Sequence, residues 1–156
     1  MLEIAIPGHG ELKLERLICD YNGTLACDGV LIPELAPLLG ALSAQLEIHV
    51  VTADTFGLAK KQLAELPVQL TVLPADRQDE RKQEYVRGLG AKSAVCLGNG
   101  RNDLLMLRDA GLGICLVEGE GCSVATLQAA DVACRSAREA LELLLHRKRL
   151  VATLRR

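Results

Sequence analysis

Residues 17–25 have the sequence LICDYNGTL, in which a short apolar run leads to a carboxylate, Asp20, and then to a sharp turn. Leu, Ile and Cys bounded by Asp, Asn and Gly predict a buried strand that ends where the polar residues begin. In an open parallel sheet, ligands bind at the carboxyl ends of the strands. Asp20 is therefore a candidate nucleophile toward a phosphoryl group, although the same pattern also fits a turn that merely ends a strand.

A second stretch repeats this pattern. Residues 95–107, VCLGNGRNDLLML, run from an apolar strand through a turn rich in Gly and Asn into a helix. Two shorter signals lie between the stretches: HVVT at 49–52 ends a predicted strand with Thr52, and RKQEY at 81–85 places Lys82 on a predicted helix. Each signal is weak alone, but the four occur in order, each closing a strand or opening a helix.

Together these motifs resemble the haloacid dehalogenase-like hydrolase superfamily, and within it the phosphorylation domain of P-type ATPases and their small soluble relatives. The first stretch matches the family motif D-x-x-G-T, and the second matches G-D-G-x-N-D with Asn99 in place of the first Asp. Thr52 and Lys82 correspond to the family's strand-ending Thr or Ser and its phosphate-binding Lys. The resemblance continues through residues 110–114 and 129–133.

Strands and helices are expected to alternate along the chain. After the strand that ends at Asp20, strands are expected at 47–51, 68–73, 93–97 and 113–117, and helices at 33–45, 55–66, 79–88, 101–110, 124–130 and 136–156. This order predicts an α/β fold, a three-layer Rossmann-like parallel sheet with helices on both faces, preceded by a β-hairpin over 1–15. Too little chain separates the motifs for a cap domain, so we expect one capless domain over 1–156.

The resemblance implies a separate catalytic role for each of three residues. Asp20 would be the nucleophile that forms an aspartyl-phosphate, Thr52 would donate its hydroxyl to the phosphoryl group, and Lys82 would offset the charge of that group. Asn22 and Asn102 would join Thr52 and Lys82 in binding phosphate. Thr52 as a residue near a helix N-cap, and Lys82 on a solvated helix face, are the structural alternatives.

The resemblance also implies a Mg²⁺ site made of oxygen ligands. Its positions here are Asp20, Asn22 through its main-chain carbonyl, and Asn99, with Asp103 as outer support. Two of these depart from the phosphatase pattern: Asn22 replaces a second Asp that serves as general acid and base, and Asn99 removes one negative charge from the metal site. P-type ATPases, dehalogenases and phosphonatases also lack the second Asp, so phosphoenzyme chemistry is still compatible with the sequence.

We therefore expect a magnesium-dependent phosphohydrolase of low turnover, acting on a small phosphorylated substrate. The alternative is a phosphate- or nucleotide-sensing module that has kept the fold without efficient catalysis. An open, capless site exposes the chemistry to water, so we also expect a homo-oligomer in which a neighbour or the short segment around Asp28 and Gly29 closes it.

Composition limits the other possibilities. With 49% hydrophobic but only 2% aromatic residues, the core must consist mainly of Leu, Val, Ile and Ala. No run approaches the ~20 apolar residues of a membrane span, and the N-terminus does not read as a signal peptide. The six cysteines contain no C-x-x-C pair, so we expect reduced thiols, no structural zinc and a cytoplasmic location.

Charge is distributed unevenly. Residues 135–156 hold seven basic and two acidic side chains, so this segment carries +5 while the rest of the chain carries −7. The simpler interpretation is a final helix whose basic end complements its own dipole. The other is an anchor for an acidic partner or a nucleic acid, although the overall charge of −2 argues against a protein dedicated to nucleic acid.

Overall fold

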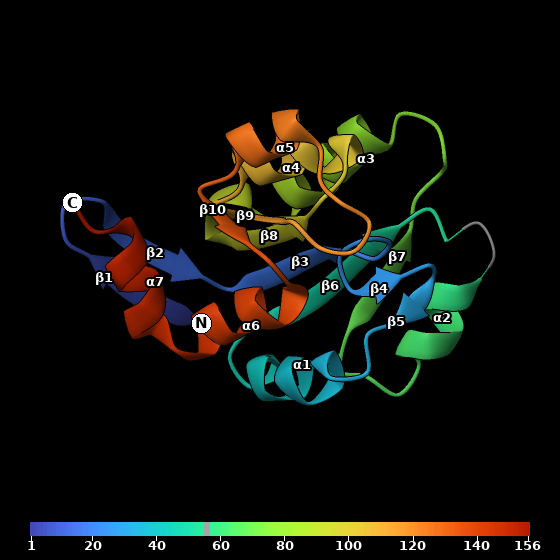
Figure 1. Ribbon diagram of the computed structural model, residues 1–156, viewed down its shortest axis with the longest axis horizontal. Helices are drawn as coiled ribbons and strands as arrows, with labels where there is room; N and C mark the ends of the chain where they lie inside the picture. The colour runs from blue at the N-terminus through green and yellow to red at the C-terminus, as the bar shows by residue number, and fades with distance from the viewer. Residues whose placement is uncertain (55–56) are drawn as a thin grey trace.

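Six parallel strands form the central sheet of the computed structural model, which describes residues 1–54 and 57–156 (Figure 1). Across the sheet they are β10 (Val132–Cys134), β9 (Leu112–Leu116), β8 (Ala94–Gly98), β3 (Arg16–Asp20), β6 (Glu47–Thr52) and β7 (Gln69–Val72). In Figure 1, one face is covered by α3 (Gln78–Gly88), α4 (Leu104–Asp109) and α5 (Val124–Ala129), and the other by α1 (Leu35–Ser43), α2 (Leu58–Leu63) and α6 (Ala137–Leu145). The predicted three-layer α/β fold is confirmed.

The central strand β3 is buried on both faces. Leu17 and Cys19 belong to the apolar cluster on one side of the sheet, and Ile18 belongs to the cluster on the other. Successive residues of a strand point to opposite faces, so a strand covered by helices on both sides needs a continuous apolar run. That run carries Asp20 to the carboxyl edge of the sheet, beside Val51 of β6 in the strand register.

An antiparallel hairpin precedes the sheet, as predicted. It pairs β1 (Leu2–Ile6) with β2 (Gly10–Leu14). The final helix, α7 (Arg147–Leu154), contacts β1 and buries Leu150, and the N–H of Arg156 donates to the carbonyl of Pro7 at 3.0 Å. The two termini therefore lie at the same end of the molecule (Figure 1).

The expected single helix over 136–156 is two helices. The backbone at His146 leaves helical geometry, with φ −109° and ψ 66°, and separates α6 from α7. Arg147, Lys148 and Arg149 consequently lie at the start of α7, where the helix dipole disfavours positive charge. The prediction that the basic end complements its own dipole is therefore wrong for these three residues and holds for Arg155 and Arg156, which follow the C-terminal end of α7. Arg149 is instead 3.2 Å from the Glu142 carboxylate.

Three other boundaries differ from expectation. The last strand predicted from the sequence is at 113–117, but the structure has a further strand, β10, at the edge of the sheet. β10 is only three residues long, with Ala133 exposed between two buried positions, and this alternation is too short to be recognised in the sequence. The helix expected at 101–110 begins as a 3₁₀ turn, η2 (Arg101–Asp103), before α4; another, η1 (Ala91–Ser93), precedes β8. The helix expected from Thr55 is shorter, and its predicted start lies outside the described residues.

Two small strands, β4 (Ala26–Cys27) and β5 (Val30–Leu31), pair antiparallel directly after β3. We call residues 26–31 the flap. In Figure 1 the flap lies beside α2, at the opposite end of the molecule from the hairpin and α7. Across the described residues, every helix is too short or too polar to cross a bilayer.

Candidate active site

The carboxyl edge of the sheet brings two predicted catalytic residues to the ends of neighbouring strands. Asp20 ends β3 and Thr52 ends β6, and both side chains are buried. The N–H of Asp54 donates to the Thr52 hydroxyl oxygen at 3.3 Å, leaving the hydroxyl proton available to another acceptor. The strand order of the sheet therefore accounts for the expected closeness of Asp20 and Thr52.

Lys82 reaches this edge from α3 and joins two carboxylates. Its ammonium nitrogen lies 2.6 Å from Asp20 Oδ1 and 2.7 Å from Asp103 Oδ1, and its side chain is completely buried. We call Asp20, Lys82 and Asp103 the ionic triad. The alternative of a solvated Lys82 is wrong. With both carboxylates ionised the ionic triad carries one negative charge in excess, in a place where charge is poorly solvated.

The acid–base properties of the ionic triad follow from that excess. Burial, reinforced by the Asp103 carboxylate, raises the pKa of Asp20 to about 7, and the Lys82 ammonium only partly opposes this. Burial alone lowers the pKa of Lys82, but the two carboxylates outweigh burial and raise it above its ordinary range. Lys82 is thus firmly protonated, and Asp20 is the residue of the ionic triad whose negative charge is only partly offset by the Lys82 ammonium.

Asp103 holds the second motif in place. Its Oδ2 accepts the main-chain N–H groups of Asn99, at 3.0 Å, and Gly100, at 2.9 Å, while its Oδ1 accepts Lys82. Gly98 has to be small here, because an added Cβ would lie 2.5 Å from the Asp103 carboxyl carbon. Both Asp103 oxygens therefore accept hydrogen bonds from the protein, which fits the predicted role of Asp103 in supporting a metal site without binding the metal itself.

The Asn99 carboxamide faces the first motif. Its Nδ2 donates to the carbonyl of Gly121 at 3.0 Å, and its Oδ1 lies 3.5 Å from the Thr24 hydroxyl. Gly23 has φ +75°, and a Cβ there would lie 2.4 Å from Asn99 Nδ2. The turn of the first motif and the loop of the second therefore fit together only with glycine at 23, which accounts for the G of D-x-x-G-T.

Two predicted phosphate-binding residues lie outside this network. Asn22 and Asn102 are exposed, and among the described residues neither side chain has a hydrogen bond to the ionic triad. The Asn102 carboxamide instead lies against Gly100, where a Cβ would be 2.6 Å from its Oδ1. The structure therefore joins Asp20, Lys82 and Asp103 directly and leaves these two amides at the surface of the site.

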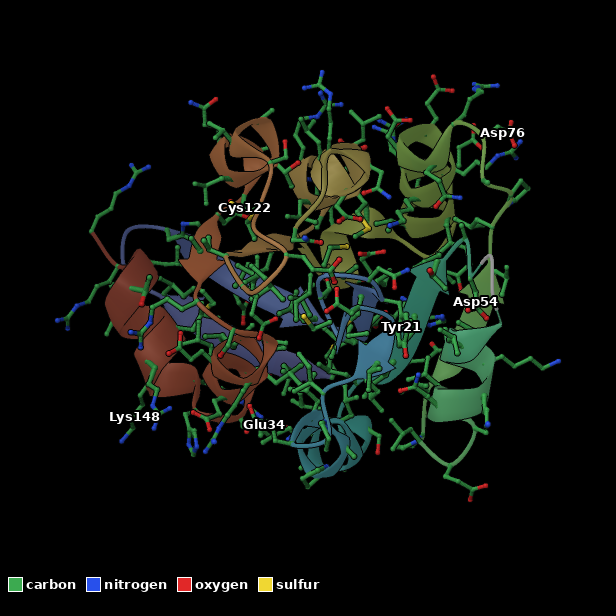
Figure 2. All side chains as sticks on the ribbon, turned by 45° about the vertical axis from the view of Figure 1, so that its right-hand side comes forward. Tyr21, Glu34, Asp54, Asp76, Cys122 and Lys148 are labelled. Atoms are coloured by element: carbon green, nitrogen blue, oxygen red, sulfur yellow. The ribbon has the colours of Figure 1, made fainter. Side chains whose placement is uncertain are left out.

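A pocket of about 310 Å³ lies at this edge of the sheet, among residues next in the chain to Asp20 and Thr52. It is lined by the residues that follow the two strands, by the flap and by the start of α2: Tyr21, Asn22, Asp28, Gly29, Ala53, Asp54 and Leu58. Figure 2 shows Tyr21 and Asp54 on the side that holds α2, and Lys148 on α7 at the far end. The pocket therefore adjoins the edge of the sheet where the predicted catalytic residues lie.

The flap is held over the pocket by two side chains that the sequence analysis missed. Gln62 of α2 donates from Nε2 to the carbonyl of Gly29 at 2.8 Å and accepts the N–H of Leu31 at 2.6 Å. The Tyr21 hydroxyl also donates to the Gly29 carbonyl, at 3.2 Å. Gln62 carried no sequence signal, because its role depends on how α2 meets the flap. Tyr21 could have been noticed by its position next to Asp20.

The oxygen atoms near Asp20 suit a weakly held hard cation. Among the described residues, no three His, Cys, Asp or Glu side chains are grouped to hold a metal. The predicted ligands that are not fully engaged are Asp20, whose second carboxylate oxygen is not bonded to Lys82, the Asn22 main-chain carbonyl and the Asn99 amide oxygen. These are the oxygen donors that Mg²⁺ prefers, but only one of them carries a formal charge.

Known proteins resemble this chain in sequence or in fold. No family model matches the chain. The uncharacterized protein MJ0073 of Methanocaldococcus jannaschii is 42% identical over 64 residues, which span 41% of this chain and 69% of that protein.

Solved structures supply the fold. A putative HAD superfamily (subfamily III A) hydrolase from Legionella pneumophila superposes with a TM-score of 0.72 at 17% identity, covering 91% of this chain and 87% of the other. The 3-deoxy-D-manno-octulosonate 8-phosphate phosphatase of Moraxella catarrhalis, solved with magnesium, phosphate and KDO, gives 0.71 at 18% identity, covering 92% and 94%. The finer likeness to relatives of P-type ATPases stays a prediction. The chain belongs to one family with the uncharacterized M. jannaschii protein, and its fold is that of the haloacid dehalogenase superfamily hydrolases.

Proposed function

We propose that this protein is a magnesium-dependent phosphohydrolase that acts through an aspartyl-phosphate at Asp20. The observation that carries the proposal is the ionic triad: a buried carboxylate at the end of the central strand, held by the Lys82 ammonium at 2.6 Å and followed in the chain by two residues that line a pocket, Tyr21 and Asn22. The phosphatase activity and bound magnesium of the M. catarrhalis structure support the same proposal.

The first half of the reaction transfers the phosphoryl group to Asp20. A carboxylate oxygen of Asp20 attacks phosphorus, a new O–P bond forms, and the bond from phosphorus to the ester oxygen breaks. Lys82 and the Thr52 hydroxyl donate to the non-bridging oxygens, whose charge grows in the transition state. The alcohol departs into the pocket and takes its proton from water, because Asn22 has no proton to give.

The second half returns Asp20 to its starting state. Water attacks the phosphorus of the aspartyl-phosphate, the O–P bond to Asp20 breaks, and inorganic phosphate leaves with the proton of the attacking water lost to solvent. A carboxylate at position 22 would take that proton, and such general-base help is worth on the order of 10²–10⁴ in rate. With Asn22 the second half should limit turnover, so the phosphoenzyme should accumulate.

Magnesium fits this site for a reason of charge. The ionic triad already has a net negative charge, so a phosphate dianion beside Asp20 would be repelled unless a cation accompanies it. Asp20, the Asn22 carbonyl and the Asn99 amide oxygen would hold Mg²⁺, with Asp103 in support. When bound, the ion supplies positive charge to the phosphoryl oxygens.

The test is a magnesium-dependent assay on a panel of phosphate esters, with Asp20→Asn as the control. Hydrolysis that requires Mg²⁺ and is lost in Asp20→Asn supports the proposal. The alternative, a phosphate- or nucleotide-sensing module, is favoured by the two amides, Asn22 and Asn99. It would replace the first proposal if phosphate or a nucleotide binds but no ester is hydrolysed faster by the wild type than by Asp20→Asn.

A further inference from the structure

We infer that the pocket beside Asp20 selects esters whose leaving group is uncharged or cationic, and that Asp28 of the flap is the specificity-determining residue. This inference rests on the proposed function and adds the class of substrate. Its basis is the charge of the pocket wall: two of the lining residues, Asp28 and Asp54, are carboxylates, and no lysine or arginine of the described residues is among the others.

Asp28 is held at a defined place by the turn that contains it. Cys27 pairs with Val30, so Asp28 and Gly29 form a two-residue turn, with φ of 51° and 77°. Two successive left-handed residues are the geometry of a type I′ turn, which suits the sequence Asp-Gly. The Gly29 carbonyl accepts hydrogen bonds from both Tyr21 and Gln62. Asp28 therefore lines the pocket from a loop whose position these hydrogen bonds fix.

Asp54 also lines the pocket, and hydrogen bonds hold its carboxylate in place. Its carboxylate oxygens accept the N–H groups of Ala59 at 2.9 Å and Lys60 at 3.3 Å, at the first turn of α2. These amides fix its position and, as N–H groups at the start of a helix, offset part of its negative charge. Asp28 and Asp54 therefore line the same pocket from different elements, the flap and the segment that follows β6.

The negative charge continues on the other side of the flap. A second pocket, of about 230 Å³, lies against Ala26 and Cys27 and is bordered by Glu118 and Glu120. Burial first, and then the nearby charges of Asp28, Glu120 and Glu118, raise the pKa of the Cys27 thiol. An anionic leaving group in the first pocket would be repelled by Asp28 and Asp54, and the glutamates on the other side of the flap would add to the negative potential. A hydroxyl or an ammonium group would meet hydrogen-bond acceptors instead.

Three matched esters test this inference: phosphoethanolamine, 2-hydroxyethyl phosphate and phosphoglycolate, whose two-carbon leaving groups are cationic, neutral and anionic. With Mg²⁺, kcat/KM for the first two should exceed that for phosphoglycolate by about tenfold or more, as expected for like charges a few ångströms apart near a protein surface. Asp28→Lys should shift the ratio toward phosphoglycolate by a similar factor. Glu65→Lys, the same charge change at an exposed position beyond the end of α2, should leave the ratio within about twofold.

Binding of the same esters to Asp20→Asn with Mg²⁺, followed by calorimetry, separates this inference from the proposed function. If no ester is hydrolysed but the neutral and cationic esters bind more tightly and Asp28→Lys reverses the order, the pocket assignment holds and the hydrolase proposal fails. Equal rates and equal affinities for all three esters, with no effect of Asp28→Lys, would overturn the inference. A preference that Glu65→Lys changes as much as Asp28→Lys would overturn it as well.

Discussion

Replacing the nucleophile should make the metal-free protein more stable at alkaline pH. Asp20 is buried beside a second carboxylate, and its pKa rises from 3.8 to about 7 on folding. Ionised Asp20 is thus less favourable in the folded chain than in the unfolded one. Asp20→Asn removes the charge and leaves an oxygen that accepts from Lys82, so Lys82 and Asp103 become a balanced pair.

The size of this effect follows from linkage between protonation and folding. One pKa unit corresponds to about 1.4 kcal/mol, so the shift from 3.8 to about 7 amounts to roughly 4 kcal/mol when the pH is above both values. Because the folded state has the higher pKa, this stability is complete below pH 3.8 and is lost as the pH rises through 7. The advantage of Asp20→Asn over the wild type should therefore grow by about 2 to 3 kcal/mol from pH 5 to pH 8.

Urea unfolding at pH 5 and pH 8, in the presence of a chelator, measures this difference directly. Asp76→Asn is a matched control, because Asp76 is an exposed carboxylate whose hydrogen bond to Arg81 lowers its pKa. That variant should change stability little, with the opposite pH trend. If Asp20→Asn is less stable than the wild type at both pH values, or if its advantage does not depend on pH, the electrostatic account of the ionic triad is wrong.

Four further predictions concern the site. Asn22→Asp should raise turnover of an alkyl phosphate at least about tenfold and reduce the phosphoenzyme trapped by rapid quenching; no gain in either would contradict the assignment of the slow step. Gly23→Ala should lower the free energy of unfolding by more than about 1 kcal/mol and impair hydrolysis, whereas Gly40→Ala, with open space around it in α1, should stabilise by up to about 1 kcal/mol. Calorimetry without phosphate should find a magnesium dissociation constant near millimolar, because Asn99 contributes no charge; micromolar affinity would argue against this. Sedimentation at micromolar concentration should show a homo-oligomer that covers two exposed apolar residues beside the pocket, Val30 and Leu58, and a monomer would exclude it.

The sequence was enough to predict the sheet because each motif joins an apolar strand to a polar turn. That pattern placed Asp20 and Thr52 at one edge, and the family motif placed Lys82 near them. The same reasoning could not tell that Asp103 uses both carboxylate oxygens within the protein, since hydrogen-bond partners depend on the folded loop. It also missed Gln62, whose function arises from the packing of α2 against the flap. The break at His146 was hidden because apolar spacing continues across it.

The ionic triad also has a consequence for how the native state is reached. Lys82 contacts carboxylates 62 and 21 residues away in the chain, and contacts of long sequence separation form only after the intervening loops have closed. In any partly folded chain in which α3 has not docked, Lys82 contacts neither Asp20 nor Asp103. The ionic triad is thus completed by the docking of α3, and chains in which that step has not occurred do not carry it.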